Sequence, residues 1–409
     1  MMKSCNLKVR ETLETDISDV CDVLVCGGGF AGISAALAAA RCGKKVILLE
    51  KEYLLGGLGT AGLVTIYLPL CDGVGNQVSF GIAEELLRLS ISLGAEGKYP
   101  SNWLDHKDQS LRTEKEKRFQ VQYNPGLFAM LAEQLLIKEG VQILYGSYAV
   151  AVHMKESKIH AVMIENKTGR GAIQCGSVVD ATGDCDIAHY AGAPTEETQR
   201  GNSPAAWYYS CGTSGYRLNM LGFLDVPGDD KEEHKISIEC KKRFYGLDGK
   251  ELSEYMQLSH ASILKEIKNR KKKEDIVWPV TLATIPQIRI SRKIVGEYIL
   301  AEEEMYQYFE DSIGMIADWR KRGPVYEVPF RTLYSAKVKN LITAGRCVSV
   351  TEPMWDIMRV IPCCAVTGQA AGTAAAMTDD FGKMDISALQ EILKENQVVL
   401  HRESSKTIS

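Results

Sequence analysis

The fold is decided by one stretch of sequence, CDVLVCGGGFAGISAALAAARCGKKVILLE, which spans residues 21–50. It begins with a short apolar run, passes through a glycine turn into the alanine-rich segment 33–42, and ends with a second apolar run at 45–49. The pattern predicts strand, turn, helix and strand, which together form one βαβ unit. Because such a crossover joins parallel strands of one sheet, we expect an α/β fold with a parallel sheet covered by helices.

The turn carries the glycine spacing of a dinucleotide-binding site. Gly27, Gly29 and Gly32 fit the pattern G-x-G-x-x-G between a strand and a helix. In this pattern the first glycine permits a tight turn, the second lets the backbone reach a pyrophosphate, and the third allows the helix to pack closely on the strand. Glu50 ends the second strand, where its carboxylate would accept hydrogen bonds from a ribose and repel the 2′-phosphate of NADP. The pattern leaves FAD and NAD open. The residues predicted to bind the dinucleotide here are Gly27, Gly29, Phe30, Ala31, Gly32, Glu50 and Lys51.

The composition excludes several classes of protein. The chain has 409 residues, 45% of them hydrophobic and 24% charged, which excludes a disordered or collagen-like chain and suits two domains. A formal net charge of -4 gives no basic footprint for nucleic acid. The 12 cysteines lack the spacing of a disulfide framework, and no apolar run suits a signal sequence or a membrane span. We therefore expect a cytoplasmic protein with reduced thiols, no nucleic-acid or membrane partner, and a size that suits a homo-oligomer.

Further periodic segments predict a discontinuous arrangement. Helices are predicted at 78–93 and 125–139, and apolar runs at 141–144, 149–153, 159–165 and 177–180 suit strands, three of them in a β-meander. Beyond residue 193, segments 252–273 and 294–309 have charged helical patterns, whereas 340–344 and 362–377 predict a last strand and a small-residue helix. The predicted domains are a dinucleotide-binding domain of residues 20–95, 121–192 and 332–400, an inserted α+β substrate domain of 96–120 and 193–331, and terminal extensions of 1–19 and 401–409.

Four later segments carry a family resemblance. They are LGGLGTAGLV at 55–64, VDATGD at 179–184, ITAGR at 342–346 and MRVIP at 358–362. Together with the first glycine turn, they make the chain resemble the FAD-dependent oxidoreductase family of the glutathione-reductase-like superfamily, nearest its fumarate-reductase-like branch. The resemblance implies a Rossmann-like domain that binds FAD noncovalently. It also implies FAD contacts from Gly56, Gly57, Thr60, Ala61, Gly62, Ala149, Ala181, Thr182, Gly183, Asp184, Gly345, Arg346, Arg359 and Ile361.

The sequence lacks the parts that other members of this superfamily need. Disulfide reductases carry Cys-x4-Cys after the first helix region, whereas residues 58–66 contain no cysteine. A dedicated NAD(P)H domain needs a second glycine fingerprint, which is missing. No histidine stands in a flavin-attachment context, and no His or Cys cluster has zinc spacing, so we expect no metal. We therefore predict an enzyme that transfers a hydride between flavin N5 and a small organic substrate, with an unknown electron acceptor or donor.

Three arginines are the candidates for catalysis. A reduced flavin carries negative charge near N1, and Arg359 at the start of the last predicted helix would stabilise that charge. Arg289 and Arg292 are three residues apart, so on a helix they would share one face and clamp a substrate carboxylate. Interdomain ion pairing is the alternative for both. Where the family has Asp-x-His, this chain has Asp318-Trp319-Arg320, which puts a histidine role in doubt.

Other assignments stay open at this point. Trp355 would narrow the substrate pocket, and Glu352 or Asp356 would act as a base, unless these side chains serve as surface groups or caps. Tyr208 and Tyr209 are further pocket candidates. Two other function classes are a flavin-dependent tRNA-modifying protein, which the net charge disfavours, and a binding protein that keeps FAD as a structural element without turnover.

Overall fold

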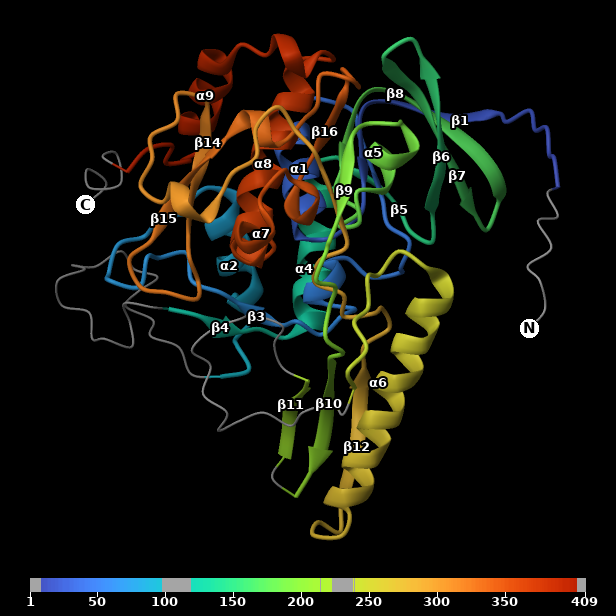
Figure 1. The fold of residues 1–409 in the computed structure, drawn as a ribbon, viewed down its shortest axis with the longest axis vertical. Helices are drawn as coiled ribbons and strands as arrows, with labels where there is room; N and C mark the ends of the chain where they lie inside the picture. Colours follow the sequence, from blue (N-terminus) through green and yellow to red (C-terminus); the bar gives the residue numbers. More distant parts are fainter. Residues whose placement is uncertain (1–8, 98–118, 214, 223–237, 239, 403–409) are drawn as a thin grey trace.

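A seven-stranded sheet forms the upper right part of the molecule as drawn in Figure 1. The computed structural model describes residues 9–97, 119–213, 215–222, 238 and 240–402, so most of the predicted segment 96–120 and the outer parts of both terminal extensions lie outside the described residues. The strand order is β5-β2-β1-β8-β7-β6, with β16 paired to β8. The strands are β1 (Ile17–Cys26), β2 (Val46–Leu49), β5 (Gln142–Leu144), β6 (Tyr148–Lys155), β7 (Lys158–Asn166), β8 (Gly169–Asp180) and β16 (Leu341–Thr343).

The sheet combines a parallel half with an antiparallel meander. Strands β5, β2, β1, β8 and β16 pair in parallel. β8, β7 and β6 pair antiparallel, and the Asn166 side chain accepts the Thr168 N–H in the turn between β7 and β8. All four residues of β2 are buried, as expected for a strand covered on both faces. The predicted α/β fold, with a Rossmann-like parallel sheet and a β-meander, is confirmed.

Two helices of small residues cross at the centre. α1 (Phe30–Arg41) follows the glycine turn, and α8 (Ile361–Met377) lies beside it (Figure 1). A Cβ atom on Gly368 would lie 2.3 Å from the Ala31 carbonyl oxygen, and one on Gly372 would lie 2.0 Å from the Ala35 carbonyl oxygen. The two backbones therefore approach more closely than any side chain would allow.

The other helices surround this pair. The Asn124 side chain caps α4 by accepting the Leu127 N–H, with Pro125 at the first position, as the sequence predicts. Gln369 on α8 accepts the Ile82 N–H at the start of α2, which begins after Gly81 and is shorter than the predicted 78–93. These helices are α2 (Ile82–Ile91), α4 (Pro125–Lys138), α5 (Asp186–Tyr190), α7 (Glu352–Met358) and α9 (Ile386–Glu395).

A smaller lobe extends away from the main sheet, at the bottom of Figure 1. It consists of a three-stranded sheet in the order β11-β10-β12 and of the long helix α6. Buried Tyr208 and Val277 on the sheet pack with Ile263 and Ile267 of α6. The elements are β10 (Ala206–Gly212), β11 (Gly215–Leu221), α6 (Gly249–Arg270) and β12 (Val277–Leu282).

Short strand pairs complete the fold. β14 and β15 pack into the same hydrophobic cluster as α1 and α8, through Ile313, Ile316 and Val328 among others. The pairs are β3 (Ile66–Tyr67) with β4 (Val121–Gln122), β9 (Thr195–Glu197) with β13 (Arg292–Ile294), and β14 (Ser312–Ala317) with β15 (Val325–Pro329). The domain boundaries stay a prediction.

The predicted helix at 294–309 is wrong. This segment begins with the end of β13, continues irregularly and contains only a short 3₁₀ turn, Glu302–Glu304. Its backbone bonds to distant segments, because the Val295 N–H donates to the Pro194 carbonyl and the Tyr298 N–H to the Arg331 carbonyl. These long-range bonds replace the i→i−4 bonds that the charged pattern predicts.

Candidate functional site

The first glycine turn leaves an open space at the start of α1. Gly27 has φ +104°, and a Cβ there would lie 2.4 Å from the Ala181 carbonyl oxygen. A Cβ on Gly32 would lie 1.7 Å from the Gly27 carbonyl oxygen, whereas a Cβ on Gly29 would meet nothing within 4 Å. No side chain caps the helix at Gly29, and its first turn holds no acidic residue. The backbone N–H groups of Phe30 and Ala31 therefore stand at a positive helix end that suits a phosphate.

Glu50 lies beside this turn, where β2 ends. Its side chain is buried, with Oε2 accepting the Gly28 N–H at 2.8 Å and Oε1 accepting the Glu52 N–H at 2.8 Å. Burial raises the pKa of Glu50, and these two N–H bonds and the nearby positive charge of Lys51 oppose the rise. Each carboxylate oxygen keeps a free lone pair, so the group can accept further hydrogen bonds from a ribose.

The second glycine segment lies directly on the first. The Gly56 N–H donates to the Gly28 carbonyl at 2.7 Å, and Gly56 forms an isolated parallel bridge with Gly29. A Cβ on Gly57 would lie 3.3 Å from the Gly29 Cα. The Thr60 hydroxyl donates to the Leu55 carbonyl and closes the turn. The predicted residues of 56–62 are thus brought to the start of α1.

The same segment also contacts the smaller lobe. The Ala61 carbonyl accepts the Thr284 N–H at 2.9 Å, and the Gly62 carbonyl accepts a hydrogen bond from the Gln287 side-chain amide. Gln287 is buried, and its Oε1 accepts a hydrogen bond from the backbone N–H of Trp207, on β10, at 3.0 Å. Gln287 therefore joins the glycine segment to the lobe.

The ends of β8 and β16 place two further segments at this edge. The Ala181 N–H donates to the Cys26 carbonyl, and the Thr182 N–H and hydroxyl both donate to the buried carboxylate of Asp180. A Cβ on Gly183 would lie 2.2 Å from Arg346 Nη2, and a Cβ on Gly345 would lie 2.8 Å from the Ala31 Cβ. These predicted residues therefore stand together at the carboxyl ends of the parallel strands, where ligands bind in such sheets.

Ala149 occupies a more distant position. It lies on β6 opposite Ile164 and is half-buried. It follows Ser147 by two residues, and the Ser147 N–H donates to the Glu50 carbonyl at 3.1 Å.

An open helix end, a buried ribose acceptor and a cradle of close backbones fit the parts of a dinucleotide, so the residues present suit FAD.

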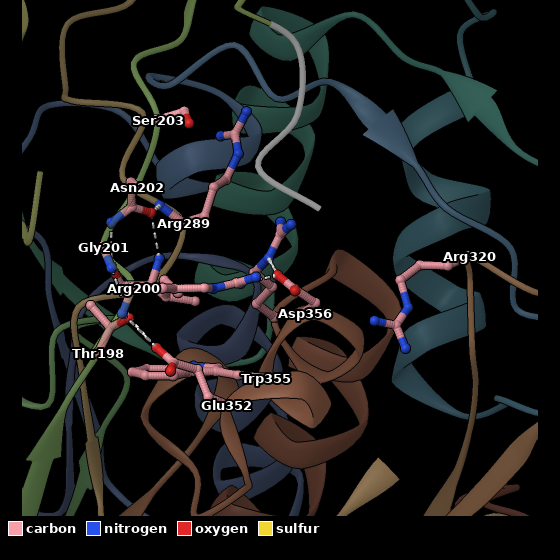
Figure 2. A network of polar contacts seen from close by, with 12 residues as sticks. Thr198, Arg200, Gly201, Asn202, Ser203, Arg289, Arg320, Glu352, Trp355 and Asp356 are labelled. Carbon is pink, nitrogen blue, oxygen red and sulfur yellow. Dashed lines mark hydrogen bonds and ion pairs between the residues drawn. The ribbon is translucent and has the colours of Figure 1, made fainter. Parts of the chain in front are cut away.

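Arg359 stands between α7 and α8, beside this edge. Its guanidinium is buried, and Nε donates to Asp356 Oδ1 at 3.2 Å. Arg200 donates to the same carboxylate oxygen at 2.6 Å (Figure 2). Burial lowers the pKa of Arg359, which the Asp356 charge opposes. Asp356 is thus the counter-ion of two guanidinium groups, and Ile361 begins α8 two residues after Arg359.

The shared helical face assumed for the predicted clamp of Arg289 and Arg292 is wrong, while substrate binding by these arginines stays a prediction. Residues 286–291 are irregular and Arg292 begins β13, so the two side chains do not share a helical face. The Arg292 guanidinium donates to the Asp184 carbonyl at 3.0 Å and to the Asp186 carboxylate at 2.7 Å. For Arg292 the alternative, ion pairing, describes the structure.

Arg289 has a different environment. Its guanidinium lies 5.2 Å from the Trp207 ring, and the residue is 8% exposed. Burial and the positive charges of Arg359 and Arg346 lower its pKa to about 10. The Arg289 and Arg359 guanidinium groups, which are both positive, therefore repel each other.

Acidic side chains that the sequence offered as bases have other partners. Glu352 accepts the Thr198 hydroxyl and the backbone N–H groups of Gln199 and Arg200, so it holds the turn after β9 (Figure 2). The buried Trp355 donates its indole N–H to the Arg346 carbonyl at 2.8 Å.

Arg320 is the departure from the expected family pattern, and its partners are clear in the structure. Arg320 stands in the place of the family histidine and pairs with Asp318 and Glu302. Sequence reasoning missed Arg200, Asn202 and Gln287, because no motif surrounds them and only the fold brings them to the site. The nearest signal in the sequence is the pair of glycine segments, close to which the fold buries these polar residues.

The described residues also bear on metal binding and on membrane crossing. No group of three or more His, Cys, Asp or Glu side chains is placed to hold a metal ion in the described ranges. Within the same ranges no single helix is long and apolar enough to cross a membrane. α7 and α8 reach that length and composition only as a pair bent by 89°, and most residues of α8 are buried.

Comparisons with known proteins agree with the geometry. The chain is 56% identical over 39 residues to fumarate reductase (cytochrome) of Shewanella frigidimarina, which covers 10% of this chain and 7% of that protein. It is 32% identical over 75 residues to thioredoxin reductase of Ureaplasma parvum, 18% of this chain and 24% of that protein. The chain therefore spans less than a quarter of the length of these curated relatives.

Solved structures are similar at a lower level. A geranylgeranyl bacteriochlorophyll reductase-like protein of Thermoplasma acidophilum has a TM-score of 0.47 and 17% identity, covering 92% of this chain and 84% of its own. A flavocytochrome c3 fumarate reductase in its open conformation has a TM-score of 0.42 and 15% identity, covering 88% and 78%. A model of the FAD dependent oxidoreductase family matches residues 22–281 and 250–393. This match includes both glycine segments, the end of β8 and the α7–α8 region, so the chain belongs to the FAD-dependent oxidoreductase family, with FAD as its cofactor.

Proposed function

We propose that the enzyme transfers a hydride between the flavin N5 atom and a small organic substrate, without a dedicated NAD(P)H domain. The observation that carries this proposal is the meeting of four segments, 27–32, 56–62, 181–184 and 345–346, at one edge of the sheet beside the buried Arg359. FAD, when bound at this edge, supplies the hydride acceptor or donor. The absence of a second glycine fingerprint from the sequence supports direct exchange with an organic substrate.

The residues of the chain divide the work of binding. The N–H groups at the start of α1 would hold the pyrophosphate, and Glu50 would accept the ribose hydroxyls. Noncovalent attachment is part of the proposal, because no histidine of the chain stands in an attachment context. The binding energy would then come from noncovalent contacts, those of the backbone cradle and of the Glu50 carboxylate.

Arg359 would set the electrostatics at the other end of the cofactor. It shares the single carboxylate of Asp356 with Arg200, so these three groups carry a net positive charge. The N-terminus of α8 adds the positive end of a 17-residue helix. Negative charge placed beside them is stabilised, which favours electron uptake there.

The smaller lobe would cover the site. The buried contacts of Gln287 with the Gly62 carbonyl and the Trp207 N–H fix the lobe against the glycine segment. A covered site excludes water and holds a substrate close to the cofactor. The substrate, the electron partner and the cytoplasmic location are all part of the proposal, and the direction of transfer is open.

The proposal is tested by anaerobic titration of the purified, FAD-loaded protein. A panel of organic acids, steroids, sugar derivatives and their reduced forms would be added to the oxidised protein. We expect loss of flavin absorbance at about 450 nm with at least one compound, and its return with a quinone or another acceptor. A protein that binds FAD and whose absorbance responds to no compound or acceptor would overturn hydride transfer and favour the structural role of FAD.

A further inference from the structure

Among the described residues, the region between the lobe and α7 holds four guanidinium groups and fewer carboxylates that pair with them. Four guanidinium groups, on Arg200, Arg289, Arg346 and Arg359, influence one another electrostatically. The carboxylates that pair with them in the described residues are Asp356, shared by Arg200 and Arg359, and Asp184, which lies 3.8 Å from Arg346. Buried charges are normally paired. Among the described residues the guanidinium groups of this region thus outnumber the carboxylates that pair with them, which favours an anionic ligand.

Arg289 is the member of this group without a carboxylate of its own. Among the described residues, no acceptor lies within hydrogen-bond distance of its Nη1, which is buried. Arg346 donates to the Ile288 carbonyl, whereas the Arg289 guanidinium has the face of the Trp207 ring as its neighbour at 5.2 Å. In Figure 2 Arg289 extends away from the pair formed by Arg200 and Asp356. An aromatic face attracts a cation but cannot accept its in-plane N–H groups.

The backbone of Arg289 is held in place by hydrogen bonds to a buried asparagine side chain. Asn202, which is 1% exposed, accepts the N–H groups of Arg289 and Ile290 with its Oδ1 at 2.9 and 3.1 Å. Its amide donates to the Phe244 and Ile290 carbonyls at 2.8 and 2.7 Å. The amide group of Asn202 is therefore fully bonded, and it fixes the base of the arginine side chain before any ligand arrives.

The neighbouring guanidinium groups limit the ligand to one negative group. Arg200 and Arg359 already hold Asp356, and Arg320 is neutralised by Asp318 and Glu302. Each of these three guanidinium groups therefore already donates to a carboxylate of the protein, whereas Arg289 donates to none in the described part of the chain. A second carboxylate on the ligand would have to compete with those carboxylates while losing its hydration, so it would add little to binding.

We propose that Arg289 binds the carboxylate of the substrate, and that the substrate is a small monocarboxylate whose apolar part lies along Trp207. Binding of a carboxylate by Arg289 does not depend on the proposed function. The statement that the bound acid is the substrate rests on the proposed function. The carboxylate would accept two N–H groups of the guanidinium in a bidentate pair, which fixes orientation as well as affinity.

The test measures binding without turnover. Isothermal titration calorimetry on the oxidised, FAD-loaded protein would compare acetate, butyrate, hexanoate and benzoate, each beside its neutral amide, and succinate beside butyrate. We expect the best acid to bind at least about 10-fold more tightly than its amide, since a charged hydrogen-bonded pair contributes at this level. Succinate should bind no more tightly than butyrate.

Variants separate the role of Arg289 from general electrostatics. Arg289→Gln should reduce the acid-to-amide ratio to about one, and Arg289→Lys should keep part of it, because an ammonium retains the charge without the bidentate geometry. The matched control is Arg170→Gln, since Arg170 lies in the β7–β8 hairpin and pairs with Glu165 at the surface. It should leave the ratio unchanged.

A thermal readout excludes a merely structural role. Removal of a buried charge without an anionic partner should raise the melting temperature of ligand-free Arg289→Gln above that of the wild type, whereas loss of a structural contact would lower it. Binding of none of the acids, tighter binding of succinate, or an acid preference that survives in Arg289→Gln would each overturn the proposal. Failure of hydride transfer is seen separately, as flavin absorbance that no compound of the wider panel changes.

Discussion

Substitution of Gly29 by alanine separates folding from FAD binding. Gly29 has φ −71° and ψ 180°, which alanine adopts without strain, and its added Cβ would meet no protein atom within 4 Å. A Gly→Ala change at such a site stabilises a fold by about 0.4 to 1 kcal/mol through the unfolded chain. The FAD-free Gly29→Ala protein should therefore be at least as stable as the wild type.

The same methyl group would fill the space where the pyrophosphate must approach the backbone. Loss of one hydrogen bond from an N–H group to a charged phosphate costs about 1.5 to 3 kcal/mol. This corresponds to an FAD dissociation constant raised about 10- to 150-fold. Urea denaturation of the FAD-free protein and quenching of FAD fluorescence on titration would measure the two effects independently.

Two matched glycines complete the design. Gly249→Ala at the start of α6 also adds a Cβ with nothing within 4 Å, far from the glycine turn in the sequence, so it should stabilise the fold by a similar amount and leave the FAD affinity unchanged. Gly32→Ala would place its Cβ 1.7 Å from the Gly27 carbonyl oxygen, so it should destabilise the fold by about 1 to 3 kcal/mol or more. Wild-type FAD affinity in a folded Gly29→Ala protein would refute the assignment of this space to the pyrophosphate.

Three further predictions concern charge and thiols. Burial raises the pKa of Glu50, so stability of the FAD-free protein should gain a contribution as the pH falls from the folded pKa toward the ordinary value of 4.5; this part of the pH slope in urea denaturation should vanish in Glu50→Gln and would be absent from the wild type if the carboxyl were not buried. Asp356→Asn should lower the free energy of unfolding by about 3 to 5 kcal/mol, because the buried guanidinium group of Arg359 and the half-buried one of Arg200 lose their carboxylate; an unchanged denaturation midpoint would contradict the shared pairing. Among the cysteines that the structure describes, iodoacetamide should modify the exposed Cys211 first, while Cys26 and Cys363, whose thiol pKa values are raised by burial, should react only on unfolding; mass spectrometry of a time course would show the order, and early labelling of Cys26 would speak against it.

The parts of the fold that the sequence predicts are those whose signals are local. The strand, glycine turn and helix of residues 21–50 are specified by spacing within the stretch, and the N-cap Asn124 with Pro125 marks the start of α4. The helix at 362–377 is likewise predicted from its own composition. In each case the physical cause of the structure lies within a few residues of the element.

The parts that fail depend on distant partners. Segment 294–309 has a helical charge pattern, yet its backbone N–H groups bond to Pro194 and Arg331. Arg289 and Arg292 would share one face only if their segment were helical. In the structure Arg292 forms an ion pair with Asp186, and Arg289 lies beside the Trp207 ring. A single sequence does not contain these long-range contacts, so the lobe side of the site could not be derived from it.

The crossing of α1 and α8 has a consequence for how this protein can change. At Gly368 and Gly372 the two helices touch through backbone atoms, so there is no side chain that a mutation could shorten to loosen the contact. Every substitution there adds volume and forces the helices apart, and the N-termini of both helices move with them. The separation between the two positive helix ends is therefore set by the main chain itself. Substitutions elsewhere can change the side chains around the proposed FAD site. At Gly368 and Gly372, however, no substitution makes only a small change in the distance between the N-termini of α1 and α8, and that distance would set the length of the cofactor between them.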